Sequence, residues 1–154
     1  MSRLKKIMFA LLAVFIAIQF IQPARNTTGQ AMPAAIAKQV SIPANVQEIL
    51  NRSCYDCHSN NTQYPWYATI QPAGWLLAKH IRDGKAELNF DEFGNYSKRR
   101  QLNKLKSVAS QINDGEMPLP SYTWIHTDAK LTAADKELIT DWVANAMDSI
   151  KAEN

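Results

Sequence analysis

The sequence predicts a mainly α-helical protein, in which one small helical domain follows an apolar N-terminal helix. From residue 43 onward, apolar residues recur at steps of three and four, which is the helical period. No segment shows the strict alternation of a half-buried strand. At the N-terminus, basic residues precede a nearly continuous apolar run. These observations indicate a helical domain with a separate N-terminal element.

Residues 1–24 are expected to be a signal anchor or a signal peptide. Arg3, Lys5 and Lys6 precede an apolar run over residues 7–21, which is the pattern of an export signal. The run is short for a membrane span, which needs roughly 17–25 residues. Its end lacks the small residues of a cleavage site, so an uncleaved membrane-anchor helix is favoured. Because the basic residues come first, the rest of the chain is expected on the outer side of the membrane.

Residues 25–42 are expected to be a flexible tether, because they are rich in Pro, Ala, Gln, Asn and Thr. Residues 43–150 then form one small domain. The chain has 17 basic and 14 acidic residues, but its first 25 residues hold four of the basic residues and no acidic one. The remainder is therefore almost neutral, with 13 basic against 14 acidic residues. This balance does not indicate a nucleic-acid surface.

The first two helices of the domain are expected on either side of a cysteine pair. Apolar residues at positions 46, 49 and 50 indicate a short helix that starts near Pro43 and ends just before Cys54. A second helix is expected from Trp75 to about Lys85, with His80 among the apolar residues of its inner side.

The last two helices have recognisable ends. Ser97 is expected to cap a helix that continues to about Ile112, and the Asp-Gly pair that follows ends it. Thr132 and Asp135 have the spacing of a capping box, so the last helix is expected to begin there. Trp142 lies on the apolar face of that helix.

The most specific motif is Cys54-Tyr55-Asp56-Cys57-His58, which has the form of a covalent c-type haem attachment site. Two thiols separated by two residues can add to the two vinyl groups of one porphyrin. The histidine that follows the second thiol is then placed as the proximal iron ligand. We therefore expect one haem c, bound through Cys54 and Cys57 and ligated by His58.

A closed haem site needs a second axial ligand, and Met117 is the first candidate. It lies in a loop stiffened by prolines, and a thioether favours ferrous iron. His80 is the alternative distal ligand, although a histidine on an apolar helix face is more often a satisfied core residue. His126 is a weaker candidate.

Four tryptophans are expected to pack in the domain. Trp75 and Trp142 lie on predicted helices and are expected in the core. Trp66 and Trp124 lie in loops, where ordinary packing is the default expectation and lining of the cofactor crevice is the alternative.

Three other readings of the cysteine pair remain open. A zinc site could use Cys54 and Cys57 with one or two of His58, His80 and His126, but adjacent Cys and His side chains rarely reach one tetrahedral ion. A redox dithiol would need a βαβ context that the sequence does not show. A structural disulfide over two residues would add little stability.

Four segments of the chain resemble those of a known group of proteins. Residues 54–60 (CYDCHSN), 64–67 (YPWY), 74–81 (GWLLAKHI) and 115–118 (GEMP) are similar to segments of small, membrane-anchored bacterial haem-binding domain proteins. The resemblance covers about residues 43–148. The order of a short helix, the cysteine motif, a methionine loop and a C-terminal helix also resembles class I c-type cytochromes.

The resemblance implies a cytochrome c-like fold around one covalent haem, with redox service in the cell envelope. In class I cytochromes the carbonyl of a proline about a dozen residues on orients the proximal histidine. Pro72 is the residue expected to do so here.

We expect a non-enzymatic electron carrier, on the periplasmic side of the bacterial inner membrane. Its partners would be the membrane and redox proteins of the envelope. The alternative is a ligand-binding haem protein, either a gas sensor or a weak peroxidase, which needs an open distal position. His80 would then be the acid/base residue.

Overall fold

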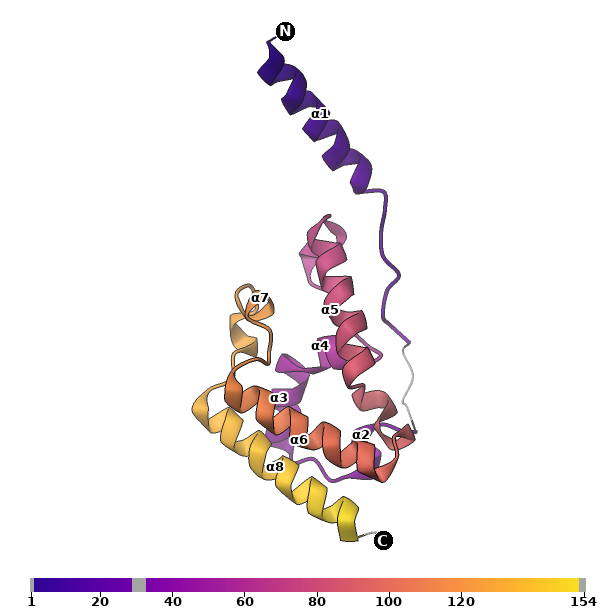
Figure 1. The fold of residues 1–154 in the computed structure, drawn as a ribbon, viewed down its shortest axis with the longest axis vertical. Helices are drawn as coiled ribbons and strands as arrows, with labels where there is room; N and C mark the ends of the chain where they lie inside the picture. The colour runs from indigo at the N-terminus through magenta and orange to yellow at the C-terminus, as the bar shows by residue number, and fades with distance from the viewer. Residues whose placement is uncertain (1, 29–32, 153–154) are drawn as a thin grey trace.

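The computed structural model describes residues 2–28 and 33–152, and within them the protein is helical (Figure 1). The α-helices are α1 (Arg3–Ile18), α2 (Ile36–Gln39), α3 (Ala44–Ser53), α4 (Tyr55–His58), α5 (Ala73–Glu87), α6 (Lys98–Asp114), α7 (Pro120–Thr123) and α8 (Ala133–Ala152). Short 3-10 helices are η1 (Trp66–Thr69), η2 (Phe90–Asn95) and η3 (Thr127–Ala129). The described residues contain one isolated β-bridge, between Thr27 and Asn61. The prediction of a mainly α-helical fold is confirmed.

Helix α1 projects from one end of the domain, and none of its residues is buried (Figure 1). It is apolar between Ile7 and Ile18, but at 1.5 Å per residue it is shorter than the roughly 30 Å hydrocarbon core of a bilayer. In the part of the chain that the structure describes, no helix is both long enough and apolar enough to cross a membrane.

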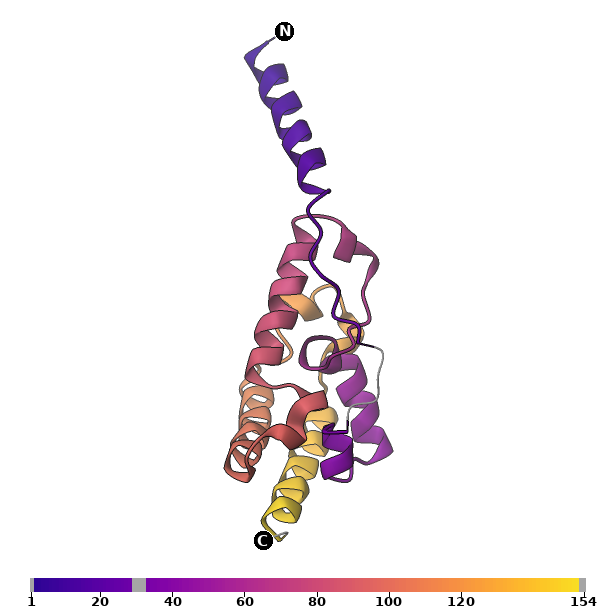
Figure 2. The same ribbon diagram turned by 90° about the vertical axis from the view of Figure 1, so that its right-hand side faces the viewer.

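The segment predicted as a tether contributes to the core. Ile36 on α2 is only 1% exposed, and Val40 is also buried. Both side chains belong to the main hydrophobic cluster, so the domain includes residues before the predicted start at residue 43. Ahead of α2, the Asn26 side chain donates to the Ser59 carbonyl and the Thr62 hydroxyl. Figure 2 shows this segment running along one side of the domain. Residues 29–32 of the predicted tether lie outside the described residues.

The main core lies where α6 and α8 pack side by side and α3 packs against α8 (Figures 1 and 2). Phe90 and Phe93 of η2 are fully buried in it, and Leu105 and Ile139 join them from α6 and α8. Trp142 is buried as predicted, and its Nε1–H donates to the Ser41 carbonyl at 3.0 Å. Such pairing is what a buried indole N–H requires.

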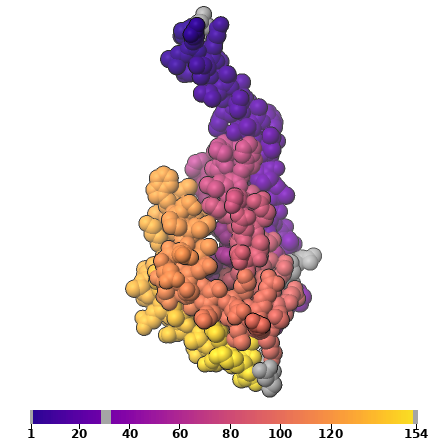
Figure 3. Space-filling model, in the orientation of Figure 1, coloured from indigo at the N-terminus to yellow at the C-terminus, as the bar shows by residue number. Residues whose placement is uncertain are grey.

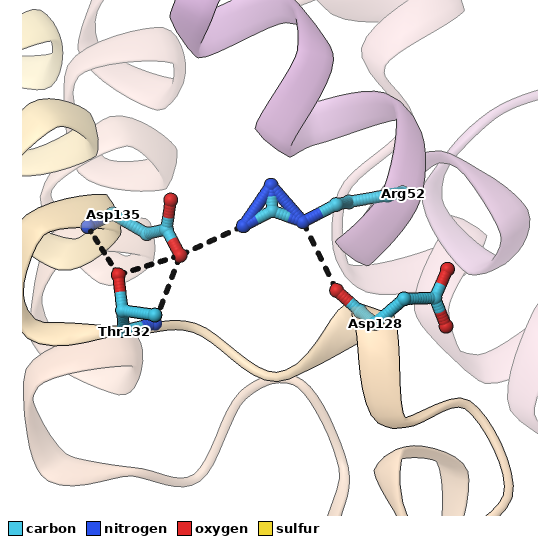
Figure 4. Close-up of polar contacts among 4 residues, drawn as sticks. All are labelled: Arg52, Asp128, Thr132 and Asp135. Carbon is cyan, nitrogen blue, oxygen red and sulfur yellow. Dashed lines mark hydrogen bonds and ion pairs between the residues drawn. The ribbon is translucent and has the colours of Figure 1, made fainter.

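The predicted end of α6 and the predicted start of α8 are confirmed, whereas Ser97 occupies the position before α6 without a capping hydrogen bond from its side chain. Helix α6 ends at Gly115, whose φ of 77° is a left-handed conformation that glycine adopts without strain. At the start of α8, the Asp135 N–H donates to the Thr132 hydroxyl, and the Thr132 N–H donates to the Asp135 carboxylate (Figure 4). Arg52 of α3 reaches the same carboxylate at 2.7 Å, which ties the helix start to α3.

The second helix differs from its prediction on one face. Helix α5 begins at Ala73 and buries Leu77 and Ile81, as the pattern indicated. Trp75, however, is exposed, although it was predicted in the core, and the neighbouring apolar Leu76 is exposed as well. The reason is that only one narrow stripe of α5 packs on the domain, because its other side lines a cavity.

Candidate functional site

A cavity of about 500 Å³ opens between α5 on one side and α6 with its following loop on the other. Figure 3 shows the molecular surface hollowed between these two parts. The volume falls within the range of small-molecule and cofactor sites. Its lining includes Ser53, Cys54, Cys57, His58, His80, Gly84, Lys104, Val108, Ile112, Met117 and Tyr122. Five of the six side chains that the sequence indicated as ligands or attachment points therefore lie around one cavity: Cys54, Cys57, His58, His80 and Met117.

The cysteine motif forms a single tight turn at the wall of this cavity. Helix α3 ends at Ser53, and the backbone N–H groups of Cys57 and His58 both donate to the Cys54 carbonyl. Because of this turn, Cys54, Cys57 and His58 all line the same cavity. Both cysteines are free and half-buried. Burial raises the pKa of Cys54 to about 12 and that of Cys57 to about 11, so both thiols are protonated at neutral pH.

The His58 ring is held in one orientation by the backbone. Its Nδ1–H donates to the Leu88 carbonyl at 2.9 Å. The proton therefore sits on Nδ1, and Nε2 keeps its lone pair for another partner. Burial lowers the pKa of His58, and the Leu88 carbonyl opposes that shift. A neutral imidazole fixed through Nδ1 is the usual state of a metal-ligating histidine.

The predicted role of Pro72 is wrong, because the carbonyl that orients His58 belongs to Leu88. The Pro72 carbonyl accepts the Leu76 N–H in the first turn of α5 and is thus used within the helix. Leu88 follows the last residue of α5, where a carbonyl has no helical donor left.

Gly84 allows α5 to approach the cysteine motif closely. A Cβ at this position would lie 2.8 Å from the Cys57 carbonyl oxygen and 3.2 Å from the Cys57 Cβ. Both distances are shorter than ordinary van der Waals contact. A residue with a side chain would therefore push the turn formed by the cysteine motif away from α5.

Met117 and His80 reach the cavity from different elements. The Met117 loop is fixed to the end of α6, because the backbone N–H groups of Glu116 and Met117 both donate to the Gln111 carbonyl. Met117 is half-buried and packs against the main core. His80 lies on α5, where burial and the neighbouring Lys79 lower its pKa. The structure thus leaves both distal candidates at the cavity.

The remaining histidine and two tryptophans lie elsewhere. The His126 ring is hydrogen-bonded to the Tyr67 hydroxyl at 2.7 Å and does not line the cavity. Trp66 and Trp124 are 78% and 82% exposed, so neither expectation for them, packing or lining of the crevice, is met.

Comparison with known families decides what kind of site this is. A family model described as a haem-binding domain matches residues 13–145, which is most of the chain. The chain belongs to the haem-binding domain family. No curated protein and no solved structure matches it.

The cavity of this haem-binding domain has the donors that a haem requires. It offers a neutral imidazole, two thiols and a thioether, within a lining that is mostly apolar. The Ser53 hydroxyl is buried at the cavity wall and has no hydrogen-bond partner within the protein. A buried hydroxyl without a partner is costly, which is consistent with a group in the cavity that supplies one.

The other readings of the cysteine pair gain no support from the structure of the haem-binding domain. Within residues 2–28 and 33–152, no three His, Cys, Asp or Glu side chains are grouped so that they could hold a metal ion. The cysteines are not joined in a disulfide. The same residues contain no strand of the kind that a βαβ dithiol site needs.

Besides Leu88 and Gly84, two more residues support the site in a way that was not predicted. The Tyr122 hydroxyl, at the cavity wall, donates to the Asp56 carboxylate at 2.7 Å. Burial and this hydrogen bond raise the pKa of Tyr122. Asp56 also accepts the Gln63 N–H, so its carboxylate joins the turn of the cysteine motif to the segments that carry Gln63 and Tyr122. The position of Asp56 between the cysteines is visible in the sequence, but its contact with Tyr122, 66 residues away in the chain, is not.

Proposed function

We propose that this haem-binding domain attaches one haem c covalently through Cys54 and Cys57 and serves as an electron carrier in the bacterial cell envelope. The observation that carries the proposal is the His58 ring, which is fixed by the hydrogen bond from its Nδ1–H to the Leu88 carbonyl and lies beside two cysteines that line the cavity. When bound, the haem would supply one-electron exchange between ferric and ferrous iron.

The residues have distinct roles in this proposal. Each thiol adds across one vinyl group: sulfur bonds to one carbon, the thiol hydrogen goes to the other, and nothing is oxidised. His58 offers Nε2 as the proximal ligand, since its Nδ1–H is already bound to the Leu88 carbonyl. Met117, from the loop after α6, is the proposed distal ligand and would raise the reduction potential.

We place the domain on the periplasmic side of the inner membrane, with α1 as its export and anchoring element. Covalent haem attachment requires reduced thiols in an oxidising compartment, and export with dedicated maturation fits this need. The α1 helix carries the basic leader and apolar run of such a signal. Redox proteins of the envelope are the expected partners.

The test of attachment is a pyridine haemochrome spectrum combined with haem staining on a denaturing gel. The full chain should be produced with a c-type maturation system. We expect staining that survives denaturation, and loss of it in the Cys54→Ser, Cys57→Ser double variant. A matched control is Ser59→Ala, which lies next to the motif but does not line the cavity. Colourless wild-type protein with free thiols would overturn the proposal.

A second function class rests on His80, a titratable side chain at the cavity. If His80 acted as an acid/base group beside an open iron position, the domain would bind gases or act as a weak peroxidase. Carbon monoxide separates the two classes. A reduced spectrum unchanged by the gas supports the electron carrier, and ready binding supports the alternative.

Single variants then identify the distal ligand. We expect Met117→Ala to open the iron to carbon monoxide and to lower the reduction potential. His80→Ala should leave both properties unchanged. The reverse result would assign the distal position to His80.

A further inference from the structure

Two segments that meet at one end of the domain lack charged side chains. Residues 57–78, which include η1 and the start of α5, contain no Asp, Glu, Lys or Arg. Residues 117–127, which include α7, also contain none. The Tyr67 hydroxyl and His126 join the two segments, and the Trp66 ring packs edge-on against Tyr67.

This uncharged end exposes large apolar side chains. Trp66, Ile70 and Leu76 project from the first segment, and Trp124 and Ile125 project from the second. We call these five residues the apolar end. Leu76 is 51% exposed, and the two tryptophans are more exposed still. Grouped apolar exposure of this kind marks an interaction surface.

The apolar end is also the end from which α1 leaves the domain (Figure 1). The Gln19 side-chain amide accepts the Gln71 N–H at 2.8 Å and donates to the Gln71 carbonyl at 3.2 Å. Gln22 donates to the Thr69 carbonyl at 3.0 Å. These hydrogen bonds fasten the base of α1 to η1 and α5, so the helix and the apolar end face the same way.

A further hydrogen bond joins the N-terminal element to the start of α5. The Trp75 Nε1–H donates to the Ile21 carbonyl at 2.8 Å. Residues 7–24 of the N-terminal element are themselves uncharged. An apolar helix, a fixed junction and an uncharged aromatic surface therefore follow one another along the molecule.

We propose that the apolar end is a membrane-docking face, which rests in the lipid headgroup region while α1 enters the bilayer. Tryptophan is enriched at membrane interfaces because its ring is apolar and its N–H is polar. The absence of charged side chains means that no ion must be desolvated on docking. Beyond the end of the first segment, Lys79 and Asp83 pair with each other. The domain then has a fixed orientation on the lipid surface, whether or not its cavity is filled.

The test is hydroxyl-radical footprinting of the full chain, free and bound to phosphatidylcholine–phosphatidylglycerol vesicles. We expect oxidation of Trp66 and Trp124 to fall several-fold on vesicle binding, together with that of α1. Tyr96, which packs against Phe93 of the main core, is the internal reference. Unchanged oxidation of both tryptophans while α1 is protected would overturn the proposal, since the domain would then hang free of the surface.

A substitution provides a second measurement. In Trp66→Asp, Leu76→Asp, we expect vesicle affinity to fall by roughly tenfold, because two carboxylates would have to enter the interface. Leu138→Asp is the control, since Leu138 is an exposed leucine on α8 and does not belong to the apolar end. Equal vesicle affinity for the double variant and the wild type would overturn the proposal. The proposal would also be overturned if the protein sediments as a dimer and its two tryptophans are protected from oxidation without vesicles, because a second copy would then cover the face.

Discussion

Replacing Gly84 by alanine sets two effects against each other, and the structure decides which is larger. Alanine is favoured over glycine in a helix by about 1 kcal/mol. However, the new Cβ would lie 2.8 Å from the Cys57 carbonyl oxygen, whereas ordinary contact begins at 3.4 Å. The obstacle is backbone and cannot rotate away, so α5 and the cysteine turn must separate by about 0.6 Å. Overpacking of this kind costs about 1–3 kcal/mol.

We therefore expect Gly84→Ala to lower the free energy of unfolding by about 1 kcal/mol. Urea unfolding followed by far-ultraviolet circular dichroism measures this change. Ala86→Gly is the matched control, because Ala86 is exposed in the same turn of α5 and reports the helix propensity alone. If Gly84→Ala stabilises the protein by the amount that Ala86→Gly destabilises it, the close contact between α5 and the Cys57 backbone does not exist.

The remaining predictions concern the helix cap, acid stability and thiol reactivity. Thr132→Ala should lower the free energy of unfolding by about 1 kcal/mol, because the Asp135 N–H loses its acceptor, and urea unfolding would show it. A change below a few tenths of a kcal/mol would contradict this role. For the chain without haem, stability should be constant between about pH 6.5 and about pH 8 and fall below pH 6.5, because burial lowers the pKa of His58 and the unfolded chain binds the proton first. His58→Phe should flatten this part of the pH profile. Finally, Cys54 and Cys57 should react with iodoacetamide at least about tenfold more slowly in the folded chain than in urea at pH 8, since burial raises both pKa values. Mass spectrometry follows this reaction, and equal rates would show that the thiols are not buried.

Local features of the site could be predicted from the sequence because they depend on residues that are close in the chain. The spacing of Cys54, Cys57 and His58 specifies one turn, and Thr132 with Asp135 specifies a helix start. The loop with Met117 follows a glycine that must end the preceding helix. In each case the physical cause lies within a few residues, so the pattern is enough.

The partner of His58 could not be predicted in this way. A backbone carbonyl has no residue type of its own, and the analogy with class I cytochromes pointed to Pro72. Whether the Leu88 carbonyl is free depends on where α5 ends and on how α5 lies against α4. The same holds for Tyr122, whose contact with Asp56 is made only after the chain has folded.

The sequence by itself determined the helical class, the turn of the cysteine motif and the helix ends, because periodicity, spacing and capping are properties of neighbouring residues. Only the tertiary structure decided that Ile36 belongs to the core, that Trp66 and Trp124 lie outside the cavity, and that both Met117 and His80 reach it. These outcomes depend on which faces of the helices are covered by distant segments. An apolar side chain is equally compatible with a core, a cavity wall or an exposed docking face until its neighbours are in place.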